Sequence, residues 1–304
     1  MKEPLAYYTV VHALEAKRGW TEDRRLAVAV EHAIKGHLSY ARYHAAGLQR
    51  AREGIGEAGV ARLVNDFLET DINPAISIMA ALRDPESALM AYNAYNATAN
   101  LGVRTSVALA GPSTRGLERL AASRAMLANR DDPEPCKTAT LSVMGAMLEH
   151  VQSGGQAMYR ATSLSGLAEF LGRGRGVAAD VARAIEDDWL APLSHLPRKL
   201  GCQKRTLERR LQEVGLTAQA LRQADRMMRA TAGLFSGDSA TAIAMDCGFS
   251  DAAHMSRSFR VACGMTPSML VKIIRHDGRP GISTRLPYRR PHAARFSEPK
   301  ASWL

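Results

Sequence analysis

The chain has 304 residues, 46% of them hydrophobic, and a formal net charge of +10. This length suits two ordinary domains, and the apolar content is enough for a buried core. No apolar run approaches the ~20 residues of a membrane helix, and the first residues lack the pattern of a signal peptide. We therefore expect a cytoplasmic protein that has no membrane partner. The four cysteines form no CxxC pair, so we expect reduced thiols, no metal site and no other cofactor.

The N-terminal part of the chain has several segments with apolar residues at helical spacing. These segments are residues 25–50, 58–69, 74–93, 115–128 and 139–152. Residues 103–110, with the sequence VRTSVALA, alternate between apolar and polar residues and predict a strand. The pattern predicts a mostly helical domain, with a mixed α+β domain as the alternative.

Two glycine-rich stretches, SGGQ at 153–156 and GRGRG at 172–176, interrupt this pattern, and the second is the better hinge. The charge also changes there, because the residues before 177 carry 20 basic and 18 acidic side chains and the later ones 20 and 12. The net charges of +2 and +8 predict a polyanionic partner for the C-terminal part. We expect an N-terminal regulatory or dimerisation domain at 1–176, a helical domain at 177–276 and a basic, disordered tail at 277–304.

The sequence ATAIAMDCGFSD at residues 240–251 predicts a short helix, a tight turn and the start of a second helix. Gly248 stands where the end of a helix favours a residue with positive φ. Phe249 is then expected to fill the core between the two helices. We expect Ser250 to cap the second helix through its hydroxyl and Asp251 to complement the dipole of that helix.

The second helix separates apolar from polar residues. Met255, Phe259 and Ala262 recur at i, i+4 and i+7, so they should face inward. The other side combines small residues with arginines, which suits a helix that enters a DNA groove between phosphates. Its members are Ala252, Ala253, Ser256, Arg257 and Arg260. The segment therefore predicts a helix-turn-helix, with a solvated αα-hairpin as the alternative.

A similar unit lies upstream. The sequence LSHLPRKLG at 193–201 predicts a short helix that ends at a glycine, and KRTLERRLQEVG at 204–215 predicts a helix with Leu207 and Leu211 facing inward. Residues 217–235 between the units predict one continuous helix of about 18 residues, roughly 27 Å long. A rod of that length can hold two recognition helices near the ~34 Å repeat of one face of DNA. A single chain could therefore read two major grooves.

Residues 181–272 resemble the DNA-binding domain of the AraC/XylS family of bacterial transcription regulators. The usual ending of this family matches IAMDCGFSDAAHMSRSFRVACGMTPS, and its first unit matches KLGCQKRTLERRL. Met255 departs from the aromatic residue or leucine that is commoner there, and Met269 and Leu270 replace a frequent tyrosine–arginine pair. These departures affect packing rather than the face that meets DNA.

The resemblance implies the residues that contact DNA. In the first unit they are Lys204, Arg205, Thr206, Glu208 and Arg209. Arginine can bridge guanine O6 and N7, and glutamate can accept from a cytosine amine, although Glu208 could instead pair with its own helix. In the second unit they are Ala252, Ala253, His254, Ser256, Arg257 and Arg260. Alanines donate no hydrogen bonds, so we expect the second unit to be less sequence-selective and to hold mainly the DNA backbone.

The N-terminal domains of this family are variable and serve in effector binding or dimerisation. The strand pattern of the commonest type, a jelly roll, is missing here. Tyr92, Asn93, Tyr95 and Asn96 offer stacking and hydrogen-bonding groups for an effector pocket, and the alternative is ordinary helix surface.

One enzymatic alternative rests on PEPCKTAT at 133–140, because some related DNA-binding domains are fused to alkyl-transfer domains with a Pro-Cys nucleophile. The histidine that usually follows that pair is absent after Cys136, and no other catalytic motif is present. We expect no enzymatic activity and no catalytic residue.

The predicted function is therefore sequence-specific regulation of transcription. The expected partners are double-stranded DNA and RNA polymerase, with a small-molecule effector and a second copy of the chain as candidates. The alternative is a protein-interaction adaptor with a DNA-binding module, which acts through RNA polymerase or another regulator without an effector.

Overall fold

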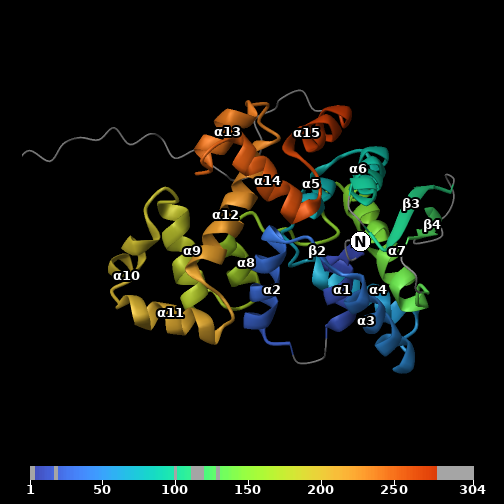
Figure 1. Cartoon of the computed structure of the whole chain (residues 1–304), viewed down its shortest axis with the longest axis horizontal. Helices are drawn as coiled ribbons and strands as arrows, with labels where there is room; N and C mark the ends of the chain where they lie inside the picture. The colour runs from blue at the N-terminus through green and yellow to red at the C-terminus, as the bar shows by residue number, and fades with distance from the viewer. Residues whose placement is uncertain (1–3, 17–19, 99–100, 111–119, 128–130, 279–304) are drawn as a thin grey trace, which may run out of the picture.

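The computed structural model in Figure 1 describes residues 4–16, 20–98, 101–110, 120–127 and 131–278. Most of these residues are helical, and the strands form two small two-stranded sheets. The predicted mainly helical fold is thus confirmed, with a few strands in the N-terminal half. All but the first two residues of the tail predicted to be disordered at 277–304 lie outside the described residues.

The N-terminal half begins with a short antiparallel sheet and two helices. Strand β1 (Leu5–Tyr7) pairs with β2 (His37–Ser39), and α1 (Tyr8–Glu15) and α2 (Glu22–Ile34) lie between them in the sequence. The helical segment predicted at 25–50 is therefore two helices, α2 and α3 (Tyr40–Arg52). The break falls at Gly36, which fits against a distant helix, and the hydroxyl of Ser39 then caps α3.

Four further helices complete this half. They are α4 (Glu57–Leu68), α5 (Pro74–Ala81), α6 (Pro85–Thr98) and α7 (Glu134–Gln152). The segment predicted as one helix at 74–93 is divided because the residue before a proline disfavours helical geometry. Asp84, which precedes Pro85, instead accepts a hydrogen bond from the amide of Ser87 at 2.8 Å and so starts α6.

A hairpin of β3 (Val103–Leu109) and β4 (Leu120–Met126) projects at the right of Figure 1. The strand predicted at 103–110 is confirmed, whereas the helix predicted at 115–128 is wrong for residues 120–126. Pairing with β3 outweighs the helix propensity of leucine and alanine there. Arg124 strengthens that pairing because its guanidinium donates to Thr105 Oγ1 across the hairpin at 2.9 Å.

The C-terminal half is entirely helical where it is described. Its elements are α8 (Leu164–Phe170), α9 (Val177–Asp187), a 3₁₀ turn (Leu193–His195), α10 (Leu196–Lys199), α11 (Lys204–Glu213), α12 (Ala218–Gly233), α13 (Ala240–Asp246), α14 (Ala252–Cys263) and α15 (Pro267–His276). The predicted hinge at 172–176 joins α8 to α9, and these two helices pack against each other.

Two hydrophobic cores both include residues from the two halves. One core joins the N-terminal helices to α13, α14 and α15, as with Met79 and Phe259. The other joins α2 to α8, α9, α11 and α12, as with Val30 and Leu221. Helix α2 packs against both α12 and α14, beside which it lies in Figure 1. The DNA-binding helices are therefore held on the N-terminal half by continuous apolar packing.

Candidate nucleic-acid interface

The first unit consists of α10, a turn at Gly201 and α11. Gly201 has a φ of +62°, which a glycine adopts without steric cost. Leu207 and Leu211 are buried as predicted. The side chains predicted to contact DNA lie on the opposite face, where Lys204, Arg205, Glu208 and Arg209 are exposed and Thr206 is partly exposed.

The charges on α11 are partly paired along the helix. Arg209 Nη1 lies 2.5 Å from Glu213 Oε1, and Lys204 Nζ lies 3.8 Å from Glu208 Oε1. Pairs this exposed contribute little stability, so DNA phosphates or bases can replace them. Arg205 forms no ion pair with any residue that the structure describes. Like Arg210 of the same helix, it therefore breaks no ion pair when it contacts DNA.

The second unit consists of α13, a turn at Gly248 and α14. Gly248 has the predicted positive φ, +77°, and Phe249 is buried between the helices. The predicted cap at Ser250 is wrong. Asp251, directly before the first helical residue, accepts a hydrogen bond from the amide of His254 at 2.6 Å, while the hydroxyl of Ser250 lies 3.1 Å from His254 Nδ1.

Helix α14 has the predicted inner and outer faces. Met255, Phe259 and Ala262 are fully buried. The other face exposes Ala253, Arg257 and Arg260, with Ala252, His254 and Ser256 partly exposed. Within the described part of the chain, neither arginine forms an ion pair. This face thus offers two free cations beside small side chains.

Helix α12 joins the two units as one continuous helix, as predicted. It has 16 residues, which corresponds to roughly 24 Å. Thr217 caps its start, and a buried ion pair within it joins Arg229 Nε to Asp225 Oδ2 at 2.7 Å. In Figure 1, α11 and α14 lie toward opposite ends of α12.

A brace that the sequence analysis missed ties the second unit to the segment between α9 and the first unit. The indole N–H of Trp189, just after α9, donates to Asp246 O at 2.9 Å, at the end of α13. The guanidinium of Arg229 lies 4.4 Å from the centre of the same indole ring. In the sequence, the only local sign of this arrangement is a pair of opposite charges four residues apart, Asp225 and Arg229, among the apolar residues of α12.

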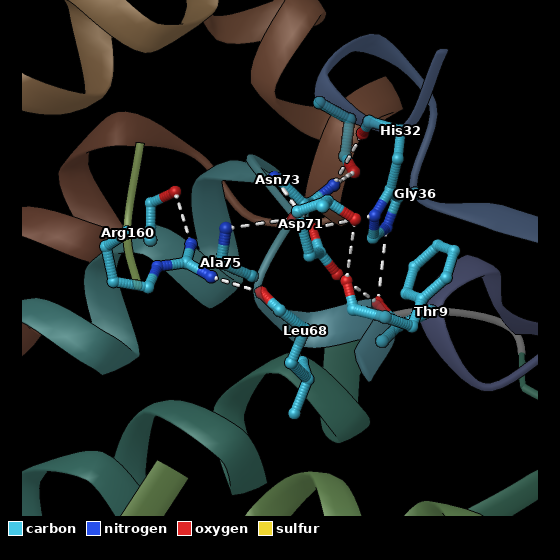
Figure 2. Close-up of polar contacts among 12 residues, drawn as sticks. Thr9, His32, Gly36, Leu68, Asp71, Asn73, Ala75 and Arg160 are labelled. Carbon is cyan, nitrogen blue, oxygen red and sulfur yellow. Dashed lines mark hydrogen bonds and ion pairs between the residues drawn. The ribbon is translucent and has the colours of Figure 1, made fainter. Parts of the chain in front are cut away.

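The carboxyl end of α14 is hydrogen-bonded to the N-terminal half. Figure 2 shows Asn73, whose Nδ2 donates to Ala262 O at 2.7 Å and to His32 O at 2.9 Å. Its Oδ1 accepts from the amide of Ala75 at 2.9 Å and so caps α5. The amide of Gly36 donates to Val261 O at 3.2 Å. Two groups of the N-terminal half therefore satisfy the last carbonyls of a recognition helix.

A buried carboxylate orients Asn73. Asp71, in Figure 2, is 1% exposed and accepts hydrogen bonds from the Asn73 amide at 2.9 Å and the Thr9 hydroxyl at 2.8 Å. His32 Nδ1 lies 2.8 Å from Asp71 Oδ1. Burial alone raises the pKa of Asp71, but the charge of His32 and these hydrogen bonds outweigh it, so the net pKa is lowered. This Thr–His–Asp set is enclosed in the core, and its role is structural.

The residues predicted to line an effector pocket all lie on α6, and its two asparagines face the β3–β4 hairpin. The amide of Asn93 exchanges two hydrogen bonds with Val107, at 2.8 and 2.9 Å, and Asn96 Oδ1 accepts from the Thr105 amide at 3.2 Å. Tyr92 and Tyr95 are buried beside a cavity of about 10 Å³, which holds at most one water. Both amides thus hold β3 in place, and a ligand role for these four residues stays a prediction.

A larger cavity, of about 210 Å³, lies between the two halves. It is formed by α5, the end of α7, the segment after it and α12, with mostly apolar lining. Its polar lining comes from Ser77, His150, Arg160, Thr162 and Thr231. The guanidinium of Arg160, shown in Figure 2, donates to Leu68 O at 2.8 Å and to Ser77 Oγ at 3.2 Å. No local pattern could have revealed this cavity, because its walls are distant in the sequence.

The cysteine of the Pro-Cys pair lies in the core. Cys136 is fully buried, and burial, aided by the nearby Asp132, raises the pKa of its thiol to about 12. The thiol is therefore protonated at neutral pH and packs between α3 and α7. Among the residues that the structure describes, no three His, Cys, Asp or Glu side chains are grouped as a metal site. None of the described helices combines the length and apolarity needed to cross a membrane.

Two helix-turn-helix units with exposed arginines, joined by one helix, define a DNA-binding protein. Residues 196–272 match the family model described as a helix-turn-helix domain. Residues 196–272 thus form a helix-turn-helix domain of the AraC type.

The solved structures with similarity to the chain include ToxT from Vibrio cholerae O395. It shows 14% sequence identity and a TM-score of 0.33, with 52% of this chain and 62% of ToxT covered. ToxT bound to (E)-4-(8-methylnaphthalen-1-yl)but-3-enoic acid shows 13% identity and a TM-score of 0.32, with 53% and 61% covered. The chain thus spans less than two thirds of the length of either. No curated protein matches the chain.

Proposed function

We propose that this regulator reads two successive major grooves, one with α11 and one with α14. The observation that carries this proposal is the continuous helix α12, which joins two units that each expose arginines. Its length of roughly 24 Å, together with the helices at its ends, suits the ~34 Å repeat of one DNA face. The domain limits proposed for this activity are 177–276 for the DNA-binding part and 1–176 for the regulatory part.

The spacing of the two half-sites tests this reading. We would map the bound DNA by footprinting and then insert about five base pairs, half a helical turn, between its two halves. A rigid α12 cannot follow that rotation, so affinity should fall by about 30-fold or more, as when several base contacts are lost. The control changes the central bases without changing their number. Equal affinity for both DNAs would mean that only one unit reads bases.

We further propose that the cavity between the halves binds a small-molecule effector. It borders α12 directly through Met228, Thr231 and Ala232, so a ligand there contacts the helix that sets the spacing of the two units. The mostly apolar walls and the single guanidinium of Arg160 favour a small apolar molecule with an acidic or hydrogen-bond-accepting group. The volume of this cavity is the observation that supports regulation of DNA binding by a small molecule.

A thermal-shift screen against small organic acids and neutral metabolites tests the effector site. A ligand that binds the folded state must raise the melting temperature. At a ligand concentration of a hundred times the Kd, the free energy of unfolding rises by about 2.7 kcal/mol. Ala232→Leu should abolish that shift because the larger side chain fills the cavity. Ala51→Leu, on the exposed side of α3, should keep it.

The alternative is an adaptor that contacts RNA polymerase or another regulator without an effector. In that case, transcription reconstituted from the purified chain, RNA polymerase and its target DNA needs no ligand, and Ala232→Leu leaves it unchanged. If instead transcription requires a ligand and is lost in Ala232→Leu, the effector hypothesis is supported.

A further inference from the structure

The β3–β4 hairpin has two edges of different character. At the edge of β3, Asn93 bonds both the N–H and the C=O of Val107, and Asn96 accepts from the N–H of Thr105. These are the backbone groups to which a third strand would bond. Side chains of α6 therefore close this edge of the sheet.

At the edge of β4 that faces away from β3, no described residue pairs with the strand. Successive residues of a strand direct their backbone N–H and C=O groups to opposite edges. Thr105 directs its groups away from β4, so the next residue, Ser106, directs its groups toward β4 and bonds Ser123 opposite it. Along β4, Ala122 and Arg124 therefore direct their backbone N–H and C=O groups away from β3. Among the described residues, no hydrogen-bond partner of these backbone groups is found.

The sequence of β4, LAASRAM, lacks the features that protect an edge strand, such as a proline, a bulge or an outward charge. Its one charge is internal, since Arg124 Nη2 lies 2.6 Å from Asp132 Oδ2 and both side chains are nearly buried. Large apolar side chains are exposed around it instead, with Leu109 at 40%, Met126 at 41% and Leu127 at 53%.

We propose that β4 pairs antiparallel with β4 of a second copy of this chain, across a two-fold axis at Ser123, to form a four-stranded sheet. This register places Leu120 opposite Met126 of the partner subunit and Ala122 opposite Arg124 of the partner subunit. Every one of these residues directs its backbone groups to this edge of β4, so about eight hydrogen bonds form.

Self-complementarity identifies a second copy as the occupant. Apolar side chains stand at both ends of β4, Leu109 and Leu120 at one end and Met126 and Leu127 at the other. An antiparallel two-fold pairing brings these opposite ends together. The central residues of the outer face are small, and Arg124 is already neutralised by Asp132, so no like charges meet across the axis.

The position of the hairpin fits this assembly. In Figure 1 the hairpin lies at the opposite end of the molecule from α10 and α11. A sheet formed across it leaves α11 unobstructed and brings two DNA-binding halves into one particle. Dimerisation here is independent of whether an effector exists or two grooves are read.

The test uses the full-length chain in sedimentation velocity over about 1 to 100 µM, where a dimer of ordinary affinity dissociates. Ser123→Lys places two like charges face to face at the axis, so it should weaken dimerisation by about tenfold at low salt. Ser106→Lys is the matched control, because Ser106 is the exposed cross-strand neighbour of Ser123 but does not lie on the axis. Melting curves should show that both variants are folded.

A charge swap gives the sharpest outcome. Ser123→Glu should also dimerise poorly alone, while its mixture with Ser123→Lys should form a heterodimer at least as tight as the wild-type dimer. Ala122→Pro, which removes an outward N–H, should weaken dimerisation further. A wild-type chain that stays monomeric over this range, equal effects of Ser106→Lys and Ser123→Lys, or no heterodimer in the mixture would overturn the proposal.

Discussion

The two helix-turn-helix units of this chain are alike in sequence but different in their surroundings. The recognition helix of the first, α11, packs on α9 of the DNA-binding half, whereas that of the second, α14, also packs on α2 and α5 of the N-terminal half. The last carbonyls of α14 accept hydrogen bonds from Gly36 and Asn73, residues of that half. The same local motif therefore shares a core with α2 in one copy, whereas in the other copy it is also hydrogen-bonded to the N-terminal half.

This difference indicates how a signal could act. A change in the N-terminal half reaches α14 directly through buried hydrogen bonds and apolar contacts, while it reaches α11 through α2 and α12. The unit that is expected to read fewer bases is thus the unit that is hydrogen-bonded to the N-terminal half. The following predictions act on this comparison.

The largest effect is expected from Gly36→Ala. A Cβ at this position lies 1.9 Å from Ala262 O, a backbone atom that cannot turn away, so α14 must move off the N-terminal half. We expect a loss of about 3 kcal/mol in folding stability, measured by chemical denaturation, with faster hydrogen exchange near Ala262 than in α11. Gly56→Ala is the control, because a Cβ there meets open space. Equal stability of the two variants would show that this contact does not hold α14.

Acid should destabilise the N-terminal half, on which the second unit is held, through His12 of α1. Burial lowers the pKa of His12 to about 3, and its ring lies 4.2 Å from that of Tyr8. Since the unfolded chain takes up this proton below about pH 6.5 and the folded chain does not, His12 stabilises the fold above that pH and its contribution is lost as the pH falls. The loss should be about 2 kcal/mol at pH 5.

His12→Phe keeps a ring against Tyr8 but removes the titrating group. Denaturation at pH 7 and pH 5 should therefore show a smaller loss for His12→Phe than for the wild type. Parallel losses in both proteins would mean that other groups cause the acid sensitivity.

The two recognition helices should also differ in what they read. Arg209→Ala should cost about 1–3 kcal/mol on the target DNA and little on random DNA, because α11 offers several base-reading side chains. Arg257→Ala should weaken both DNAs by similar factors, since its neighbours on α14 are alanine and serine. Both side chains are exposed, so both variants should fold. Binding isotherms on target and scrambled duplexes decide this, and a target-specific loss in Arg257→Ala contradicts our ranking.

The smallest effect is expected at the brace between the units. Trp189→Phe keeps a ring near Arg229 but loses the hydrogen bond to Asp246 O, which should cost about 1 kcal/mol of stability. If the brace fixes the angle between the units, affinity should fall for DNA with both half-sites and stay unchanged for DNA with one. Equal losses on both DNAs would point to a local packing defect instead.

The sequence by itself determined the local architecture of the DNA-binding half. The glycine at 248, the core position of Phe249, the inward faces of α11 and α14 and the single helix α12 all depend on contacts within a few turns of the chain. Short-range hydrogen bonding also explains the one local error, since the side chain of Asp251 stands directly before the helix and caps it in place of Ser250.

Only the tertiary structure decided which unit is tied to the N-terminal half and where the cavities lie. Asn73 and Ala262 are 189 residues apart, and no periodicity within either segment indicates their contact. Residues 120–126 have good helix formers, yet they form a strand because β3 supplies a partner for their backbone groups. Local propensities amount to tenths of a kcal/mol per residue, so packing and pairing between distant segments outweigh them.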